Sequence, residues 1–187
     1  MTHTKICLDG IERCSWVTED QVYLDYHDKE WGVPLRGQRE LFEAIALEGF
    51  QAGLSWLTIL KRREQFRAAF ENFEPQAVAD FDERKIADLM QDSGIIRNQA
   101  KITATIHNAR LVIERDINLT ELLWSFAPTQ APETKVFSWQ ATSPESDRMS
   151  RELKSLGFKF VGSTTMYALM QSAGMIQDHA PNCQFGN

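Results

Sequence analysis

Apolar residues recur at helical spacing through most of this 187-residue sequence, and this periodicity limits its fold more than any other feature. It predicts helices over residues 38–50, 55–70, 83–91, 98–113, 143–156 and from 162 onward, with a short helix opened by Pro75. The one strand-like run covers residues 158–161, and residues 127–142 have the composition of a loop. A fold built on a sheet needs several strands, so the sequence predicts an all-α class.

Short polar side chains stand where four of these helices are expected to begin. Ser55, Asp82, Asn98 and Ser143 each precede an apolar stripe, and side chains of this kind accept hydrogen bonds from the free N–H groups of a first helical turn. Gly94 follows the helix over 83–91, since glycine readily terminates a helix.

The composition fits a globular protein, with 43% hydrophobic and 25% charged residues. No apolar run approaches the ~20 residues of a membrane helix, and the first residues lack an apolar signal region, so we expect a cytoplasmic protein without a membrane partner. We also expect a monomer. Residues 1–12 are interpreted as an N-terminal extension, and residues 13–187 as a single domain of two helical lobes.

The net charge of −6 argues against nucleic-acid binding when it is taken as an average. The acids are unevenly distributed, however. Residues 93–113 contain no acid but include Arg97, Lys101 and Arg110, and residues 148–177 carry four basic residues against Glu152. Both an ordinary solvated surface and a local basic face fit this pattern.

Residues 83–113 are expected to form two helices joined by a tight turn around Gly94 and Ile96. A helix–hairpin–helix presents the backbone N–H groups at the start of its second helix to a DNA phosphate, without reading the base sequence. In that interpretation Arg97 and Lys101 lie near the phosphate. A plain helical corner is the alternative, since the turn has one glycine.

Four residues near the two ends of the chain have the chemistry of zinc ligands. Cys14 and His27 lie near one end, and His179 and Cys183 near the other, in an H-x3-C spacing. The three cysteines of the chain are an odd number without an export signal, which favours reduced thiols or metal. A set of unrelated side chains and a Cys14–Cys183 disulfide are the alternatives. Four protein ligands would leave no open position for catalysis, so zinc here would have a structural role.

The tract LEGFQAGLSW over residues 47–56 places a carboxylate, Glu48, at the end of an apolar helix. Glutamate is rarely buried without a partner, and here Gln51, two glycines and Trp56 follow it. Further aromatic residues near the N-terminus are Trp16, Tyr23, Tyr26 and Trp31. Flat rings around one anion suit a flat cationic ring as ligand. Alternatively, Trp31 and Trp56 are core residues and Glu48 makes a local salt bridge.

Taken together, these stretches resemble the 3-methyladenine DNA glycosylase I family from about residue 12 to 183. The matching runs are RCxW at 13–16, YHDxEWGVP at 26–34, LEGxQAGLSW at 47–56, GIIR at 94–97, FKFVG at 158–162, and DH with a cysteine at 178–183. The tracts around Glu48 and His27 are the most specific. Two departures are the ten or so residues before Cys14, which include Cys7, and Phe50, where a polar residue is expected.

The resemblance implies a helix–hairpin–helix glycosylase fold that removes 3-methyladenine from alkylated double-stranded DNA, with base flipping. It implies structural zinc on Cys14, His27, His179 and Cys183. It also implies a base pocket of Glu48, Tyr26 and Trp56, with Trp16 nearby. We interpret Glu48 as the specificity group and electrostatic catalyst. Leu54 or Gln51 is expected to fill the gap left by the flipped base.

Two other functions share some of these features. A nucleic-acid-binding helical module would use the hairpin and need no Glu48 pocket. A zinc hydrolase would need an open metal position. The sequence leaves the full range of excised bases, including 3-methylguanine, undecided.

Overall fold

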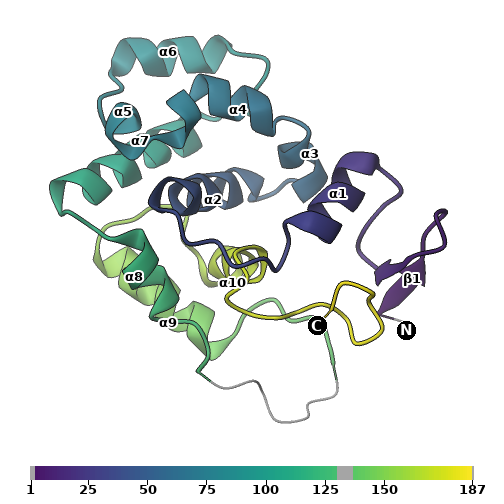
Figure 1. The fold of residues 1–187 in the computed structure, drawn as a ribbon. Coiled ribbons are helices and arrows are strands. Elements are labelled where there is room, and N and C mark those ends of the chain that lie inside the picture. Colours follow the sequence, from purple (N-terminus) through teal and green to yellow (C-terminus); the bar gives the residue numbers. More distant parts are fainter. Residues whose placement is uncertain (1–2, 130–136, 187) are drawn as a thin grey trace.

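The computed structural model describes residues 3–129 and 137–186 and is mostly helical there (Figure 1). The predicted all-α class agrees with this, apart from one pair of short strands. The elements are β1 (Thr4–Ile6), β2 (Glu12–Cys14), α1 (Gln21–Lys29), α2 (Gln38–Gln51), α3 (Trp56–Leu60), α4 (Arg63–Ala69), the 3-10 helix η1 (Glu71–Phe73), α5 (Pro75–Ala79), α6 (Glu83–Gln91), α7 (Gln99–Glu114), α8 (Leu119–Trp124), α9 (Pro144–Ser155) and α10 (Ser163–Ser172).

The main hydrophobic core surrounds α2, which lies in the middle of the helical body (Figure 1). Nine consecutive or near-consecutive residues of α2, from Leu41 to Phe50, are buried, on all sides of the helix. Because this burial extends into the last turn of α2, the carboxylate of Glu48 lies inside the protein. Phe50 is fully buried and packs on Phe66 at a ring-centroid distance of 4.7 Å, so this departure from the family pattern is accommodated in the core.

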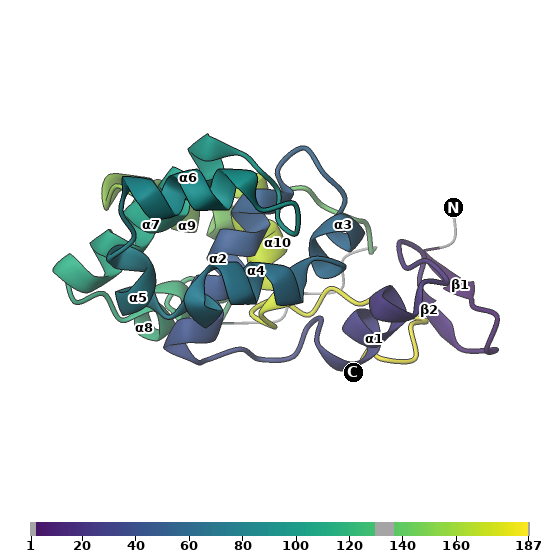
Figure 2. The ribbon, with the colours of Figure 1, turned by 90° about the horizontal axis from the view of Figure 1, so that it is seen from above.

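A second, smaller cluster lies where the two ends of the chain meet. The C-terminal segment runs beside the strand pair and α1, away from the main helical body (Figure 2). The backbone N–H of Gln184 donates to the carbonyl of Glu12 at 2.9 Å, which ties the two ends together directly. Cys7, Cys14, Trp31, Ala180 and Cys183 are buried in this cluster.

Most of the predicted helices and all four predicted caps are confirmed. Ser55, Asp82, Asn98 and Ser143 each accept a hydrogen bond from a backbone N–H of the following turn. The predicted helix over 55–70 is wrong, because the chain breaks after Leu60 into α3 and α4. At this break the Arg62 guanidinium donates to the carbonyls of Ser93 and Gly94, so a tertiary contact turns the chain. Helices α1 and α8 were not predicted.

The predicted strand over residues 158–161 is wrong, because the backbone there forms bends. Side chains bind its main-chain groups instead. The Asn108 side chain accepts from the N–H of Lys159 and donates to its carbonyl, and Ser150 donates to the carbonyl of Val161. The strands that do form, β1 and β2, pair antiparallel with Thr4 opposite Cys14, so the strand pair crosses the predicted boundary after residue 12.

The predicted loop over 127–142 falls partly outside the described residues, which omit 130–136. Within the described part of the chain, we find no helix with the length and apolar character that crossing a membrane requires.

Candidate active site and metal centre

Glu48 lies in the last turn of α2 and is buried, with 4% of its surface exposed. Its Oε1 accepts a hydrogen bond from the Ser172 hydroxyl at 3.3 Å. No group among the described residues donates to its Oε2. Burial raises the pKa of Glu48 to about 8, and the bond from Ser172 offsets this only in part. A buried acid with a free oxygen costs free energy and marks a candidate functional group.

The ring of Trp56 provides a second buried polar atom without a partner. Trp56 is the first residue of α3, and its indole Nε1 meets no acceptor among the described residues. The rings of Trp56 and Tyr26 lie 5.7 Å apart at an angle of 54°. Burial, with the nearby Glu48 carboxyl as a smaller cause, raises the pKa of Tyr26 well above its usual value, so this phenol stays protonated. Two rings and one acid therefore face the same space.

This space, which we call the aromatic cavity, has a volume of about 260 Å³. The residues of the predicted pocket all lie at its walls, and so do two further candidates for base binding, Trp31 and Gln51. The pocket residues are Glu48, Tyr26, Trp56 and Trp16. Trp31 also stacks on His27 at 6.1 Å and meets the edge of His179 at 4.6 Å. Trp31 therefore contacts both the aromatic cavity and the histidines near the two ends of the chain.

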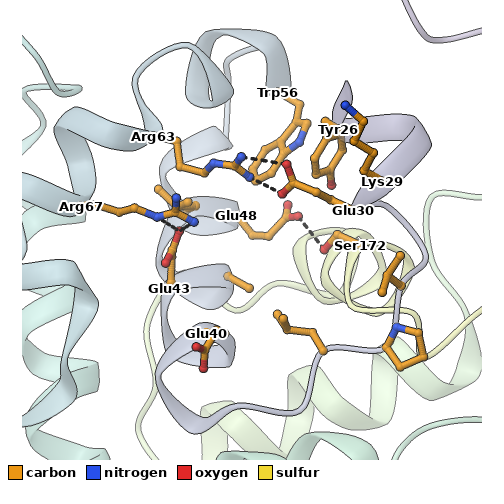
Figure 3. A pocket seen from close by; sticks show the side chains of 15 residues that line it. Tyr26, Lys29, Glu30, Glu40, Glu43, Glu48, Trp56, Arg63, Arg67 and Ser172 are labelled. Carbon is orange, nitrogen blue, oxygen red and sulfur yellow. Dashed lines mark hydrogen bonds and ion pairs between the residues drawn. The ribbon is translucent and has the colours of Figure 1, made fainter. Parts of the chain in front are cut away.

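A second space, which we call the charged cavity, lies against Glu48 as well and has a volume of about 270 Å³ (Figure 3). Tyr26, Glu48 and Trp56 line both cavities. In the charged cavity the Arg63 guanidinium binds both oxygens of Glu30, at 2.5 and 2.9 Å, and Arg67 binds Glu43. The charges in these ion pairs neutralise one another, and among the described residues no cation pairs with Glu48 (Figure 3).

Sequence reasoning did not identify Ser172, Arg63 or Gln171 as neighbours of the site. Ser172 is 124 residues from Glu48 along the chain, and nothing in the local pattern marks it. Gln171 lines the aromatic cavity from the same end of α10. Ser172 and Gln171 reach the site because α10 packs against α2, and Arg63 reaches it from α4, so only the tertiary fold brings them together.

Cys14, His27, His179 and Cys183 come together at the junction of the two chain ends, with their four ligand atoms within 4.8 Å of one another. Cys183 Sγ lies 3.5 Å from His27 Nε2 and 3.4 Å from His179 Nδ1, and Cys14 Sγ lies 3.7 Å from His179 Nδ1. Zinc bonds of about 2.3 Å to sulfur and about 2.0–2.1 Å to nitrogen, at tetrahedral angles, place such atoms about 3.6 Å apart. The donor set therefore fits a tetrahedral zinc ion.

The ring nitrogens of the two histidines that point away from this cluster are also bound. His27 Nδ1 lies 2.8 Å from the Asp28 carboxylate, which Arg13 holds in turn at 2.7 Å. His179 Nε2 lies 3.3 Å from the carbonyl of Trp31. Such outer contacts are typical of metal-binding histidines, because they fix the ring and its tautomer. Cys7 is buried nearby but is not one of the four.

Helices α6 and α7 are joined by the predicted tight turn, with Arg97 exposed and Ile96 half-buried. The N–H of Gly94 donates to the Asp92 carboxylate at 2.7 Å within this turn. Lys101 is placed differently from its prediction. It is 8% exposed, and its ammonium donates to the carbonyls of Phe50 and Ala52 at 2.8 and 2.6 Å. Its charge therefore stabilises the C-terminal end of α2. The phosphate contact of Lys101 stays a prediction, and in this structure its ammonium binds the two carbonyls instead.

A mostly helical body that holds a buried acid and several aromatic rings around one cavity defines a class of protein with an internal site suited to a flat ring. The chain belongs to the methyladenine glycosylase family, which it matches over residues 16–186, and it is an enzyme of base-excision repair with 3-methyladenine glycosylase activity.

Similar proteins cover nearly the whole chain. It is 45% identical over 179 residues to DNA-3-methyladenine glycosylase 1 of Escherichia coli strain K12. The aligned region covers 92% of this chain and 96% of that protein. A crystal structure of a 3-methyladenine DNA glycosylase I, 43% identical, superposes with a TM-score of 0.88 and covers 94% of this chain and all of the other. The Staphylococcus aureus enzyme, studied for its recognition of 3-methyladenine, is 34% identical with a TM-score of 0.84 and covers 91% and 94% of the two chains.

Proposed function

We propose that the enzyme recognises 3-methyladenine as a flipped base held in the aromatic cavity, where Glu48 selects the cationic ring. Methylation at N3 makes the adenine ring positive and its glycosidic bond weak, so departure of the neutral base needs little acid catalysis. The enzyme then needs mainly to remove the base from the stack and to bind it. The observation that carries the proposal is that Oε2 of buried Glu48 and Nε1 of Trp56, two residues of the same cavity, lack a hydrogen-bond partner among the described residues.

Glu48 has the chemistry to tell the damaged base from normal adenine. An ionised carboxylate accepts a hydrogen bond from the exocyclic amino group and attracts a positive ring, and this attraction is stronger in a buried site than in water. With a pKa of about 8, Glu48 is mostly neutral until a cation arrives. The cationic base therefore induces the charge that binds it, while neutral adenine meets a neutral acid.

The proposal is tested by the bases released from methylated duplex DNA. We expect Glu48→Gln to release 3-methyladenine about 100-fold more slowly, because it keeps the shape but loses the charge. Glu40→Gln is the matched control: Glu40 is a glutamate of the same helix but lies outside the aromatic cavity. Release at the parent rate by Glu48→Gln would falsify the assignment.

We also propose that residues on the outer turns bind the duplex. Leu54 is 42% exposed in the turn after α2, where Gly53 has a φ of +84°, whereas Gln51 lines the cavity. This favours Leu54 as the residue that fills the gap left by the base, and Gln51 as part of the pocket. Arg97 is exposed just before the first turn of α7, and the start of a helix favours a phosphate. Arg97→Ala should weaken binding to all duplex sequences alike. It should also lower the slope of the logarithm of the binding constant against the logarithm of the salt concentration by about one.

Structural zinc on Cys14, His27, His179 and Cys183 is part of the same proposal, supported by ligand distances that suit a tetrahedral ion. When bound, the zinc joins the two ends of the chain; its four positions are filled by protein, so catalysis stays with the organic pocket. Metal analysis of the purified protein should give one zinc per chain, and gentle chelation should lower the melting temperature. A zinc hydrolase would instead lose activity at temperatures where the chain stays folded.

A further inference from the structure

Ser172 is the last residue of α10, and its hydroxyl is within hydrogen-bond distance of two acceptors. Glu48 Oε1 lies at 3.3 Å and the carbonyl of Leu169 at 3.2 Å. A serine hydroxyl has one proton, so it donates to one of these at a time. The Leu169 carbonyl also accepts from the N–H of Ala173 at 2.9 Å, so it keeps a partner when the serine turns away.

The neutral and the ionised forms of Glu48 favour different directions for the Ser172 hydroxyl proton. A neutral Glu48 can donate its own proton to the Ser172 oxygen, while the Ser172 hydroxyl donates to Leu169. An ionised Glu48 is only an acceptor, and the single donor within reach of its Oε1 among the described residues is Ser172. In that state Oε1 is satisfied by the protein and Oε2 is left for the base.

We propose that Ser172 is a positioning residue for Glu48, whose hydroxyl turns from the Leu169 carbonyl to Oε1 as Glu48 ionises to receive the cationic base. This rests on the proposed role of Glu48. Ser172 thereby fixes the carboxylate with its free oxygen toward the ligand, and sets the pH range over which recognition works. The direction of the pKa effect agrees, because the bond from Ser172 lowers the pKa of Glu48 against the effect of burial.

Other groups around Glu48 do not provide this adjustment. From α1, Tyr26 stays protonated and Glu30 is bound by Arg63 of α4. Lys29 pairs with Asp25, and Arg67 pairs with Glu43 of α2 itself. These charges are therefore balanced in pairs, and among the described residues Ser172 makes the only hydrogen bond to the Glu48 carboxyl.

The experiment measures 3-methyladenine release against pH for the parent enzyme, Ser172→Ala and Ser172→Thr. The matched control is Ser155→Ala: Ser155 is the last residue of α9 and donates to the carbonyl three residues earlier, as Ser172 does, but makes no contact with Glu48. We expect Ser172→Ala to shift the acid limb of the rate–pH profile to a pH about one unit higher. At pH values below this limb, release should be about tenfold slower than in the parent enzyme. Ser172→Thr should restore the parent profile, and Ser155→Ala should leave it unchanged.

A second measurement separates this inference from the proposed function. The pH midpoint of the Glu48 carboxyl is followed by infrared difference spectra against Glu48→Gln, and it should rise in Ser172→Ala whether or not excision is observed. A parent enzyme that releases no 3-methyladenine overturns the proposed function but leaves this titration informative. Should Ser172→Ala fail to fold, Ser172→Cys replaces it, since a thiol is a weak donor. Coincident profiles and midpoints for the Ser172 and Ser155 variants overturn the inference, as does a shift that threonine fails to restore.

Discussion

The cluster of two cysteines and two histidines and the Glu48 site are both buried and polar, but they differ in how far their polar atoms have partners within the protein. In the Cys/His cluster the four ligand atoms face one another, and the outer nitrogens of His27 and His179 are bound by Asp28 and the Trp31 carbonyl. At the other site, Glu48 Oε2 and Trp56 Nε1 have no partner among the described residues. The contrast teaches that satisfied buried polarity stabilises a fold, while unsatisfied buried polarity marks a place that receives a ligand.

The strongest test of this contrast removes one member of the Cys/His cluster. We expect Cys183→Ala to lose metal and about 4 kcal/mol of stability, because the two chain ends are no longer joined. For a chain of this length that lowers the melting temperature by roughly 10 °C in thermal unfolding. Cys7→Ala, a buried cysteine outside the cluster, is the control and should lose far less. Equal losses for both variants would show that the cluster only fills space.

The pH dependence of stability tests the unsatisfied side of the contrast. The pKa of Glu48 rises from its usual value of 4.5 to about 8 on folding. Between these values the unfolded chain is ionised and the folded chain holds the proton, so the free energy of unfolding falls as pH rises from about 4.5 to about 8. Denaturant titrations should show Glu48→Gln gaining up to about 3 kcal/mol over the parent between pH 5 and 8. Parallel curves for the two proteins contradict this account of Glu48.

A smaller effect is expected from the residue that orients a metal-binding histidine. Asp28→Asn should weaken zinc binding about 10–100-fold, measured by competition with a chelator, because His27 loses the carboxylate on its outer nitrogen. At saturating zinc the excision rate should match that of the parent. Asp25→Asn, which removes an exposed ion pair with Lys29 on the same helix, is the control. Unchanged zinc affinity in Asp28→Asn would mean that the Asp28 carboxylate acts only as the ion-pair partner of Arg13.

The smallest expected change in stability is that of Trp56→Phe, which deletes the unpartnered N–H but keeps an aromatic ring. The free energy of unfolding should change by no more than about 1 kcal/mol, because no hydrogen bond within the protein is lost. Calorimetry should show that free 3-methyladenine binds several-fold more weakly. If stability falls by several kcal/mol while binding is kept, Trp56 is a core residue rather than a pocket wall.

Local chemistry along the chain determined much of the fold. The caps at Asp82, Asn98 and Ser143 define α6, α7 and α9 to within a residue or two, since a cap and the first turn are neighbours in sequence. Local signals failed where a distant group decides the backbone. Arg62 breaks the helix predicted over 55–70 by reaching the turn at Gly94, and Asn108 holds the backbone that resembled a strand.

The sequence by itself also determined which residues have the chemistry of a site: an acid at the end of an apolar helix with aromatic residues, and four zinc-type ligands at the two ends of the chain. Only the tertiary structure decided which of their atoms are free. Groups that are far apart in sequence, such as the side chains of Ser172 and Glu48 or the Lys101 ammonium and the Ala52 carbonyl, meet because helices pack. Burial and hydrogen-bond satisfaction depend on the whole surrounding shell, so no local pattern could show that Glu48 lacks a second partner or that Lys101 has two.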